Sequence, residues 1–362
     1  MQLGSASTVI YKRNDGIVLN EATKIAFTRT LPKQKEAKQT RKPKSEVKKL
    51  KSEIKKEKKK ANAKNKAKIR VIAVGEKAKK MQDRSGHDVL IESPVAMGKV
   101  VDVPLAKKYF TQIFKKVTGS LALGRTCLFC VPCSLTADEI CDFKSVAYVA
   151  GVDSVEFIPN VIAGAYAMGA DITGSAAVMY VNIGEGGTDI AVITYAGILA
   201  GGSIDDGGAV ATKAVHEYIE SKFKISISER MAEQAKIECA TLLLNNEISF
   251  KVRGVDTENG TPKEIWFTGV DCYRVLLPIY SRIAKAILQV LNECSPDVVG
   301  DLKNGAIYIG GGASSPTGLR EFMTMNLDMN VVLNADSVNA VIIGAGRLLS
   351  DKELLKKIVK AN

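Results

Sequence analysis

The chain of 362 residues is 46% hydrophobic and 25% charged, which is typical of a globular protein that buries one large core or two smaller ones. Its seven cysteines, an odd number, argue against a disulfide-stapled scaffold, and no apolar run approaches the ~18 residues of a membrane-spanning helix. Because no secretory leader pattern opens the chain, we expect a cytoplasmic protein with reduced thiols.

Most of the net charge of +12 belongs to one segment. Residues 33–70 hold 18 Lys/Arg against four Glu, a net of +14, so the rest of the chain sums to −2. From Ser45 onward the segment is rich in Ala, Glu and Lys, which favours a partly helical, flexible insertion. One interpretation is a solvated charge run; the other is attraction to anionic lipid, nucleic acid or an acidic protein. The segment contains no aromatic residue for base stacking, so sequence-specific nucleic-acid binding is not expected.

After the insertion, hydrophobic patterns predict regular elements. Residues 105–117 read as an amphipathic helix, residues 126–131 as a buried strand, residues 137–150 as a helix and residues 162–169 as a small-residue helix. Cys127 and Cys130 have the spacing of a zinc knuckle. In a strand, however, side chains at i and i+3 point to opposite faces, so we expect no metal site there.

Glycine-dense turns recur along the chain. Residues 178–193 form two apolar runs around a Gly-Glu-Gly-Gly turn, which predicts a β-hairpin able to approach a phosphate closely. Residues 3–11 form a similar unit, and a third turn, Gly-Gly-Gly-Ala, follows a strand at residues 310–313. Helices are predicted at 211–223, 228–244, 270–293 and from 319, with a hairpin around 256–260. Three such turns suggest two related α/β halves that face a nucleotide.

The sequence resembles MreB, the bacterial actin, over nearly its whole length. The resemblance rests on LGSAST, GIVLNE, AVGEKAKKM, CVPCSLT, the hairpin VMYVNIGEGGTDIAVI, AEQAKIECA, AIYIGGGAS and AVIIGAGRLL, in that order. It implies an α/β actin-like ATPase fold, with two RNase-H-like domains around a nucleotide cleft. Domain I would comprise residues 1–160 and 337–362, with the insertion at 33–70, and domain II residues 161–336. Family members carry several residues before the first strand, so either this strand is short or the true start lies upstream.

The resemblance also implies a binding site for ATP or ADP. Its nucleotide-binding residues would be Gly4, Ser5, Ala6, Ser7, Gly184, Glu185, Gly186, Gly187, Glu233, Lys236, Glu238, Gly310, Gly311, Gly312 and Ala313.

The groups that catalyse hydrolysis in the family are altered here. The relevant positions are Gln2, Asn160, Asn182 and Thr188: the family's Asp-Leu-Gly is Gln-Leu-Gly, its Asp-Ile-Gly-Gly-Gly is Asn-Ile-Gly-Glu-Gly, and its Glu-Glu-Pro aligns with Pro-Asn-Val. An amide brings no charge to Mg²⁺, and Asn160 cannot act as a general base. Glu185 also places a carboxylate in the phosphate turn. We therefore expect weakened Mg²⁺ binding and weak or absent hydrolysis.

By resemblance, the function is a filament-forming cytoskeletal protein of cell shape that assembles with itself. Alternatives are an active ATPase with unusual metal ligands, a regulator that co-assembles with other MreB copies, or a relative of Hsp70 or sugar kinases. Membrane association could come from residues 33–70 or from Leu121 and Leu123, which occupy the family's membrane-inserting loop. The other interpretation of these leucines is that they pack inward.

Overall fold

The computed structural model describes residues 1–362 except 31–67, 83, 87, 119–124 and 334–336. The predicted helix within 33–70 and the membrane-contact residues Leu121 and Leu123 therefore lie outside the described residues. The strands that flank the insertion are described: β4 (Ile25–Thr30) pairs antiparallel with β5 (Lys68–Val74), and Thr30 lies opposite Lys68. The insertion thus joins two paired strands, as predicted.

The first half is built on a five-stranded mixed sheet, which we call sheet I. Its order is β10-β9-β1-β2-β3. The strands are β1 (Gln2–Leu3), β2 (Ser7–Lys12), β3 (Gly16–Ala22), β9 (Thr126–Val131) and β10 (Ser154–Pro159). One face carries α3 (Val103–Val117) and α4 (Ala137–Val149), whose apolar sides form a core with Phe129. Thr136 and Glu139 form a capping box that fixes the start of α4.

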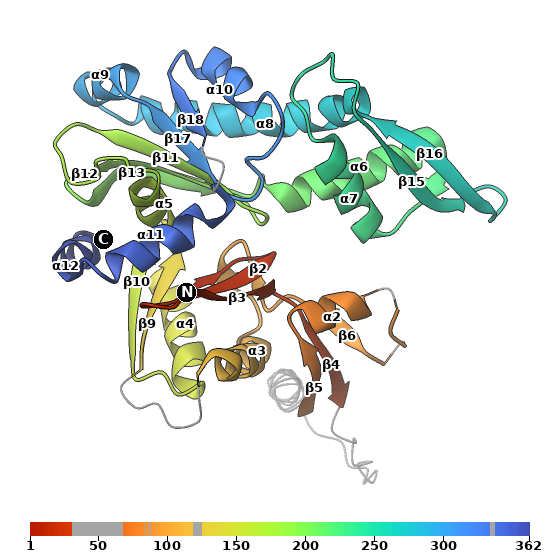
Figure 1. The fold of residues 1–362 in the computed structure, drawn as a ribbon, viewed down its shortest axis with the longest axis horizontal. Helices are drawn as coiled ribbons and strands as arrows, with labels where there is room; N and C mark the ends of the chain where they lie inside the picture. The colour runs from red at the N-terminus through yellow and green to blue at the C-terminus, as the bar shows by residue number, and fades with distance from the viewer. Residues whose placement is uncertain (31–67, 83, 87, 119–124, 334–336) are drawn as a thin grey trace, which may run out of the picture.

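The second half repeats this plan in sheet II, ordered β13-β12-β11-β17-β18 (Figure 1). The strands are β11 (Val178–Ile183), β12 (Thr188–Thr194), β13 (Gly197–Ile204), β17 (Ile307–Gly310) and β18 (Val331–Leu333). The predicted hairpin at 178–193 is confirmed, with Val178 opposite Ile193. The outer face of sheet II carries α8 (Gly269–Asn292), α9 (Pro296–Asn304) and α10 (Leu319–Leu327). Helices α6 (Gly208–Phe223) and α7 (Glu229–Cys239) lie to one side of this sheet, where they pack on each other and on α8 (Figure 1).

Two small-residue helices lie between the sheets. They are α5 (Asn160–Ala167) and α11 (Ala340–Leu348), and α12 (Lys352–Ala361) follows the latter (Figure 1). Gly344 of α11 lies so close to α5 that a Cβ there would sit 1.8 Å from the Ala163 carbonyl oxygen. A Cβ on Gly164 of α5 would likewise overlap the Tyr180 ring. The small residues therefore let the two helices and both sheets pack tightly.

Smaller elements extend each half. The first half carries helix α2 (Glu76–Met81) and a three-stranded sheet of order β5-β4-β6, whose third strand is β6 (Leu90–Glu92). It also carries the hairpin of β7 (Val95–Ala96) and β8 (Lys99–Val100). The second half carries β14 (Ile225–Ser226), β15 (Ser249–Asp256) and β16 (Pro262–Thr268). The short helix η1 (Ser337–Asn339) precedes α11.

Three details refine the sequence predictions. The helix expected at 228–244 ends at Cys239, because Leu242 donates a backbone hydrogen bond to Thr317 and Thr317 donates one to Ala240. Helix α8 is long and apolar enough to cross a membrane by length and composition, but half of its most apolar window is buried within the fold. In β9, Cys127 joins the α3 core and Cys130 the core between the sheets, so the two thiols do lie on opposite faces.

Candidate functional site

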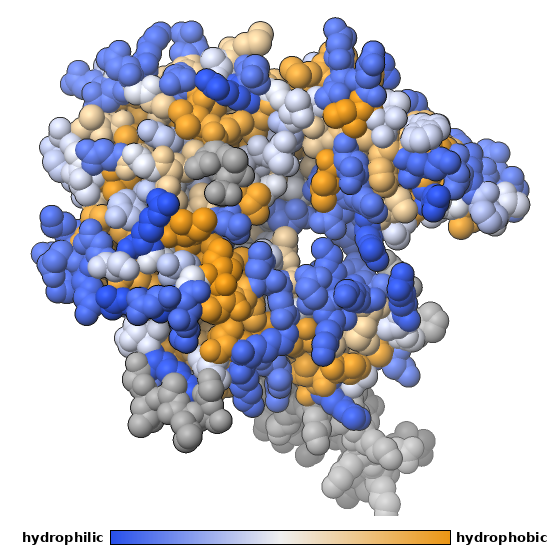
Figure 2. Space-filling model, in the orientation of Figure 1, coloured by the Kyte–Doolittle hydropathy of each residue, from blue (hydrophilic) through white to orange (hydrophobic). Residues whose placement is uncertain are grey.

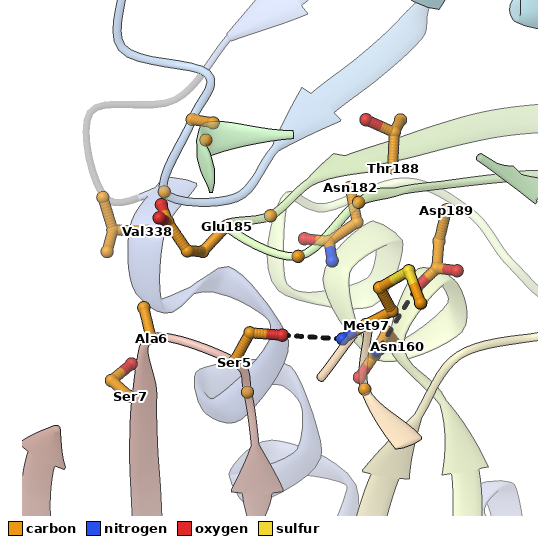
Figure 3. A pocket seen from close by; sticks show the side chains of 18 of the residues that line it. Ser5, Ala6, Ser7, Met97, Asn160, Asn182, Glu185, Thr188, Asp189 and Val338 are labelled. Atoms are coloured by element: carbon orange, nitrogen blue, oxygen red, sulfur yellow. Dashed lines mark hydrogen bonds between the residues drawn. The ribbon is translucent and has the colours of Figure 1, made fainter. Parts of the chain in front are cut away.

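A cavity of about 400 Å³ lies between the two halves, where the glycine turns of both sheets meet. Figure 3 shows Ser5, Ala6 and Ser7 on one side and Asn182, Glu185 and Thr188 on the other. The predicted site residues that line the cavity are Gln2, Gly4, Ser5, Ala6, Ser7, Asn160, Asn182, Gly184, Glu185, Gly186, Gly187, Thr188, Glu233, Lys236, Gly312 and Ala313. The fold thus gathers residues from widely separated parts of the chain around one space.

The two turns have the same backbone hydrogen bond. The Gly4 N–H donates to the Ser7 carbonyl over 2.9 Å, and the Gly184 N–H donates to the Gly187 carbonyl over 2.9 Å. In the second turn the glycines are sterically required. A Cβ on Gly186 would lie 2.2 Å from Ser5 Oγ and 2.8 Å from the Met97 nitrogen. The turns therefore approach each other closely, as a pair of backbone cradles for an anion must.

Ser5 is held in place by the β7–β8 hairpin. Its Oγ accepts a hydrogen bond of 2.8 Å from the Met97 N–H (Figure 3). Met97 itself has a left-handed backbone with φ of 51°, which is uncommon for a residue other than glycine. The hairpin thus orients the first turn from outside sheet I.

Helices α6 and α7 form the wall beside Glu185. Lys236 Nζ donates to the Gly208 carbonyl over 3.0 Å and to Thr212 Oγ1 over 2.8 Å. It also lies 4.0 Å from the Glu185 carboxylate. Burial raises the pKa of Glu185, while the charge of Lys236 opposes that shift. The carboxylate that the sequence places in the phosphate turn is therefore directed toward Lys236, away from the amides of the site (Figure 3).

The amides of Asn160 and Asn182 and the carboxylate of Asp189 form a cluster at the end of the cavity away from Glu185 (Figure 3). Asn160 Nδ2 donates to Asp189 Oδ2 over 3.3 Å, and Ser203 Oγ donates to Asp189 Oδ1 over 2.5 Å. Asp189 is 7% exposed, and burial raises its pKa although both hydrogen bonds oppose the shift. The Asn160 Oδ1 atom is buried and has no hydrogen-bond partner among the described residues.

Asp189 is the functional candidate that the sequence analysis did not select. It ends the motif Asn-Ile-Gly-Glu-Gly-Gly-Thr-Asp, one residue after Thr188, so the motif itself was the available signal. Thr188 has a structural contact, because its Oγ1 donates to the Asp206 carbonyl over 2.7 Å.

These residues fit a nucleotide better than they fit a metal ion. The backbone N–H groups of the paired turns and the ammonium group of Lys236 can bind an anion without another charged side chain. In the described part of the chain, no three His, Cys, Asp or Glu side chains gather as a metal site. Mg²⁺ prefers carboxylate oxygens, and among the described residues at this end of the cavity Asp189 is the one carboxylate beside the three amides. The cluster of Gln2, Asn160 and Asn182 therefore does not fit a tightly held Mg²⁺.

Some predicted site residues lie elsewhere. Glu238 is exposed on α7 and does not line the cavity, and neither do Gly310 and Gly311. Gly311 instead supports the strand end: its φ is 97°, and a Cβ there would lie 2.3 Å from the Ile183 carbonyl oxygen. Their assignment to the nucleotide site stays a prediction.

Two contacts connect the halves at the mouth of the cavity. Lys79 of α2 lies 3.8 Å from Glu233 of α7, and Gln82 Nε2 donates to Glu229 Oε2 over 3.1 Å. Both contacts are exposed, so each contributes little stability. They place α2 opposite α7 across the opening (Figure 1).

Comparison with known proteins agrees with this architecture. A family model described as MreB/Mbl protein matches residues 51–357. The chain belongs to the MreB/Mbl family. Among its relatives, the cell shape-determining protein Mbl of Bacillus subtilis is 27% identical over 362 residues, covering 99% of this chain and 97% of that protein.

Solved structures of MreB/Mbl-type and related proteins show the same fold. MreB5 of Spiroplasma citri bound to ADP superposes with a TM-score of 0.81 at 23% identity, covering 97% of this chain and 95% of that one. The MamK double helical filament gives a TM-score of 0.73 at 17% identity, covering 96% and 97%. The actin-like fold predicted from the sequence is therefore confirmed.

Proposed function

We propose that this member of the MreB/Mbl family is a filament-forming protein of cell shape that binds adenine nucleotide in the cleft and hydrolyses it weakly or not at all. One observation carries the proposal: the two phosphate-type turns keep a common backbone geometry, while the side chains beside them are the amides of Gln2, Asn160 and Asn182. Nucleotide binding depends mostly on the backbone of the turns, and hydrolysis depends on the side chains beside them.

The support for nucleotide binding is steric and electrostatic. Gly186 leaves room where the two turns meet, and Lys236 provides a positive charge on the cavity wall. The MreB5 relative was solved with ADP. Isothermal titration of the full chain with ADP and ATP tests the proposal: saturable binding with or without Mg²⁺ is expected, and no heat of binding for either nucleotide would refute it.

The support for weak hydrolysis is the chemistry of the side chains that would bind Mg²⁺ and activate water. When Mg²⁺ is bound in an ATPase, it neutralises charge on the phosphates. Here the amides supply no charge for the metal and no base for water. Asp189 is the buried carboxylate next to Asn160, and it accepts hydrogen bonds from Asn160 and Ser203. An active ATPase with unusual ligands remains the alternative function, and Asp189 is the residue that would favour it.

Self-assembly is proposed from the family. The MamK relative was solved as a double helical filament. Since subunit contacts lie on domain surfaces, they do not need the chemical step, so we expect filaments that form with little dependence on nucleotide and turn over slowly. Pelleting and electron microscopy test this at tens of micromolar protein, where weak contacts become populated. Monomers alone under these conditions would contradict it, and pelleting only with a second MreB protein would favour the co-assembling regulator.

We also propose a cytoplasmic location, and membrane association through residues 33–70. The +14 charge of that segment beside a nearly neutral body supports the membrane association. Deleting the segment should abolish binding to anionic vesicles and leave pelleting intact. The binding should weaken as salt shortens the ~10 Å Debye length. Equal vesicle binding with and without the segment would show that its lysines are a solvated loop, and any residual apolar contact would then point to Leu121 and Leu123.

A further inference from the structure

The second turn (residues 184–187) is held in place by the loop that joins β13 to α6. The Gly208 N–H donates to the Gly184 carbonyl over 2.9 Å. A Cβ on Gly207 would lie 2.6 Å from both the Gly184 carbonyl oxygen and the Gly187 nitrogen. Because the loop and the turn pack backbone against backbone, a shift of the loop would move the N–H groups of the turn.

Asp206 of this loop is bonded to the residue that follows the turn. Its carbonyl oxygen accepts a hydrogen bond of 2.7 Å from Thr188 Oγ1, and Thr188 begins β12. Thr188 is buried, so little water competes for this bond. The position of Asp206 therefore helps to determine where the second turn ends.

Arg282 of α8 holds the side chain of Asp206. Its Nε donates to Asp206 Oδ2 over 2.8 Å, and its Nη2 donates to Asp206 Oδ1 over 2.5 Å. Such a bidentate pair fixes orientation as well as distance, and it is stronger than a neutral hydrogen bond. The Asp206 side chain is 16% exposed, so water screens the pair less than it screens an ion pair between two exposed side chains. Neither residue lines the cavity, so any effect of Arg282 on a ligand must pass through the loop and the turn.

Helix α8 gives Arg282 a rigid support. Its start is fixed by a capping box of Thr268 and Asp271. Ile279 and Ile283, which precede and follow Arg282 in the helix, are buried in the core of the second half. The guanidinium therefore extends from a packed helix, which favours one fixed geometry of the ion pair.

We propose that Arg282 is a positioning residue for nucleotide binding, because its ion pair with Asp206 holds the second turn in the conformation that presents backbone N–H groups to the phosphates. The inference rests on the nucleotide binding proposed above, and it assigns a role in that binding to a residue outside the cavity. Its consequence is selective: ligands with phosphate groups depend on Arg282, whereas adenosine, which has none, does not. An ion pair that stabilised only the fold would affect both kinds of ligand equally.

The first experiment compares ADP and adenosine by isothermal titration of the full chain. Arg282→Ala should weaken ADP binding by about fivefold to tenfold, a typical coupling within one hydrogen-bonded network, and leave adenosine binding unchanged. Arg282→Lys keeps the charge without the bidentate geometry, so a smaller loss is expected. Unchanged ADP affinity in Arg282→Ala, or an equal loss for adenosine, would overturn the proposal.

Asp206→Ala separates positioning from general electrostatic attraction. Removing this carboxylate takes away a negative charge near the second turn, so attraction alone would strengthen ADP binding. Positioning predicts the opposite: a loss similar to that of Arg282→Ala, and no further loss in the double variant. Stronger ADP binding by Asp206→Ala, or additive losses in the double variant, would contradict the role of Arg282.

Arg253 provides the matched control. It donates to Glu264 over 2.8 Å in an exposed ion pair on β15 and β16, so Arg253→Ala removes the same charge and the same kind of contact. These strands form an arm with a mainly hydrophilic surface, and Arg253 does not line the cavity (Figure 2). Arg253→Ala should leave ADP affinity unchanged, and a loss equal to that of Arg282→Ala would assign the effect to net charge and refute positioning.

Hydrogen exchange of the ligand-free protein tests positioning without nucleotide. In Arg282→Ala the amides of residues 184–187 should exchange about tenfold faster, and in Arg253→Ala they should exchange as in the native chain. Unchanged exchange in Arg282→Ala would overturn the proposal. The titrations also separate this inference from the proposed function. A native chain that binds no ADP refutes nucleotide binding and this role with it, whereas ADP binding that neither Arg282→Ala nor Asp206→Ala alters refutes the role of Arg282 alone.

Discussion

The two halves of the molecule share one strand order and one turn geometry, but they differ in what the turns carry. Each turn is closed by a hydrogen bond from its first residue, Gly4 or Gly184, to the carbonyl three residues later. The first turn continues with Ser5, whereas the second continues with Glu185. The comparison shows that backbone geometry can be retained while the side chains that determine the chemistry diverge.

The central strands provide a second contrast. Strand β11 has six residues and pairs with β12 along its whole length, while β1 has two residues, which pair with Val9 and Thr8 of β2. Sheet I still holds its order because β9, β2 and β3 pack on a separate core with α3 and α4. The order of sheet I therefore rests on this apolar core as well as on the pairing of its strands.

The largest expected effect comes from breaking the contact that holds the halves together. Gly344→Ala places a methyl group against the Ala163 carbonyl, so we expect the free energy of unfolding to fall by about 3 kcal/mol. Gly300→Ala is the matched control, because that helical glycine of α9 has no atom within 4 Å of a Cβ. It should be neutral or stabilising by up to about 1 kcal/mol. Urea denaturation measures both, and equal stabilities would contradict the packing account.

A second variant makes the turns more alike by removing the charge of the second. Glu185→Gly should strengthen ATP binding by roughly tenfold, because Lys236 is no longer paired with a carboxylate 4.0 Å away. Adenosine has no phosphate, so its affinity should not change. Titration calorimetry compares the two ligands; an equal gain for adenosine would assign the effect to general loosening of the site.

The smallest effect concerns Asp189. In sheet II Asp189 lies opposite Asn182, and at the corresponding position of sheet I Val9 lies opposite Gln2. Burial raises the pKa of Asp189 in the folded protein, so the folded state binds more protons than the unfolded state from about pH 4 upward. Its contribution to stability is therefore greatest below that pH and is lost as pH rises through the folded pKa.

Asp189→Asn removes this dependence. Relative to the native chain, the variant should gain on the order of 1 kcal/mol between pH 4 and pH 7, with the Asn160 amide turned to accept from the new side chain. Chemical denaturation across this pH range measures the difference. A difference that is constant with pH would show that the carboxylate is charged throughout.

Local patterns predicted much of this architecture. The hairpin at 178–193, the strand 126–131 and helix α4 follow from hydrophobic periodicity and turn residues within each segment. The end of α7 could not be predicted, because it depends on contacts with Thr317, 76 residues from Thr241. Asp189 was missed for a similar reason: its partners Ser203 and Asn160 are 14 and 29 residues away and become neighbours through the fold.

The most direct test of the central claim is phosphate release from ATP in the presence of Mg²⁺. The native chain, with amides at Gln2, Asn160 and Asn182, should release phosphate near the background rate. A variant with Gln2→Asp, Asn160→Glu, Asn182→Asp and Glu185→Gly should be at least ~100-fold faster, the typical contribution of a positioned base. Fast Mg²⁺-dependent release by the native chain, with no gain in the variant, would contradict the account.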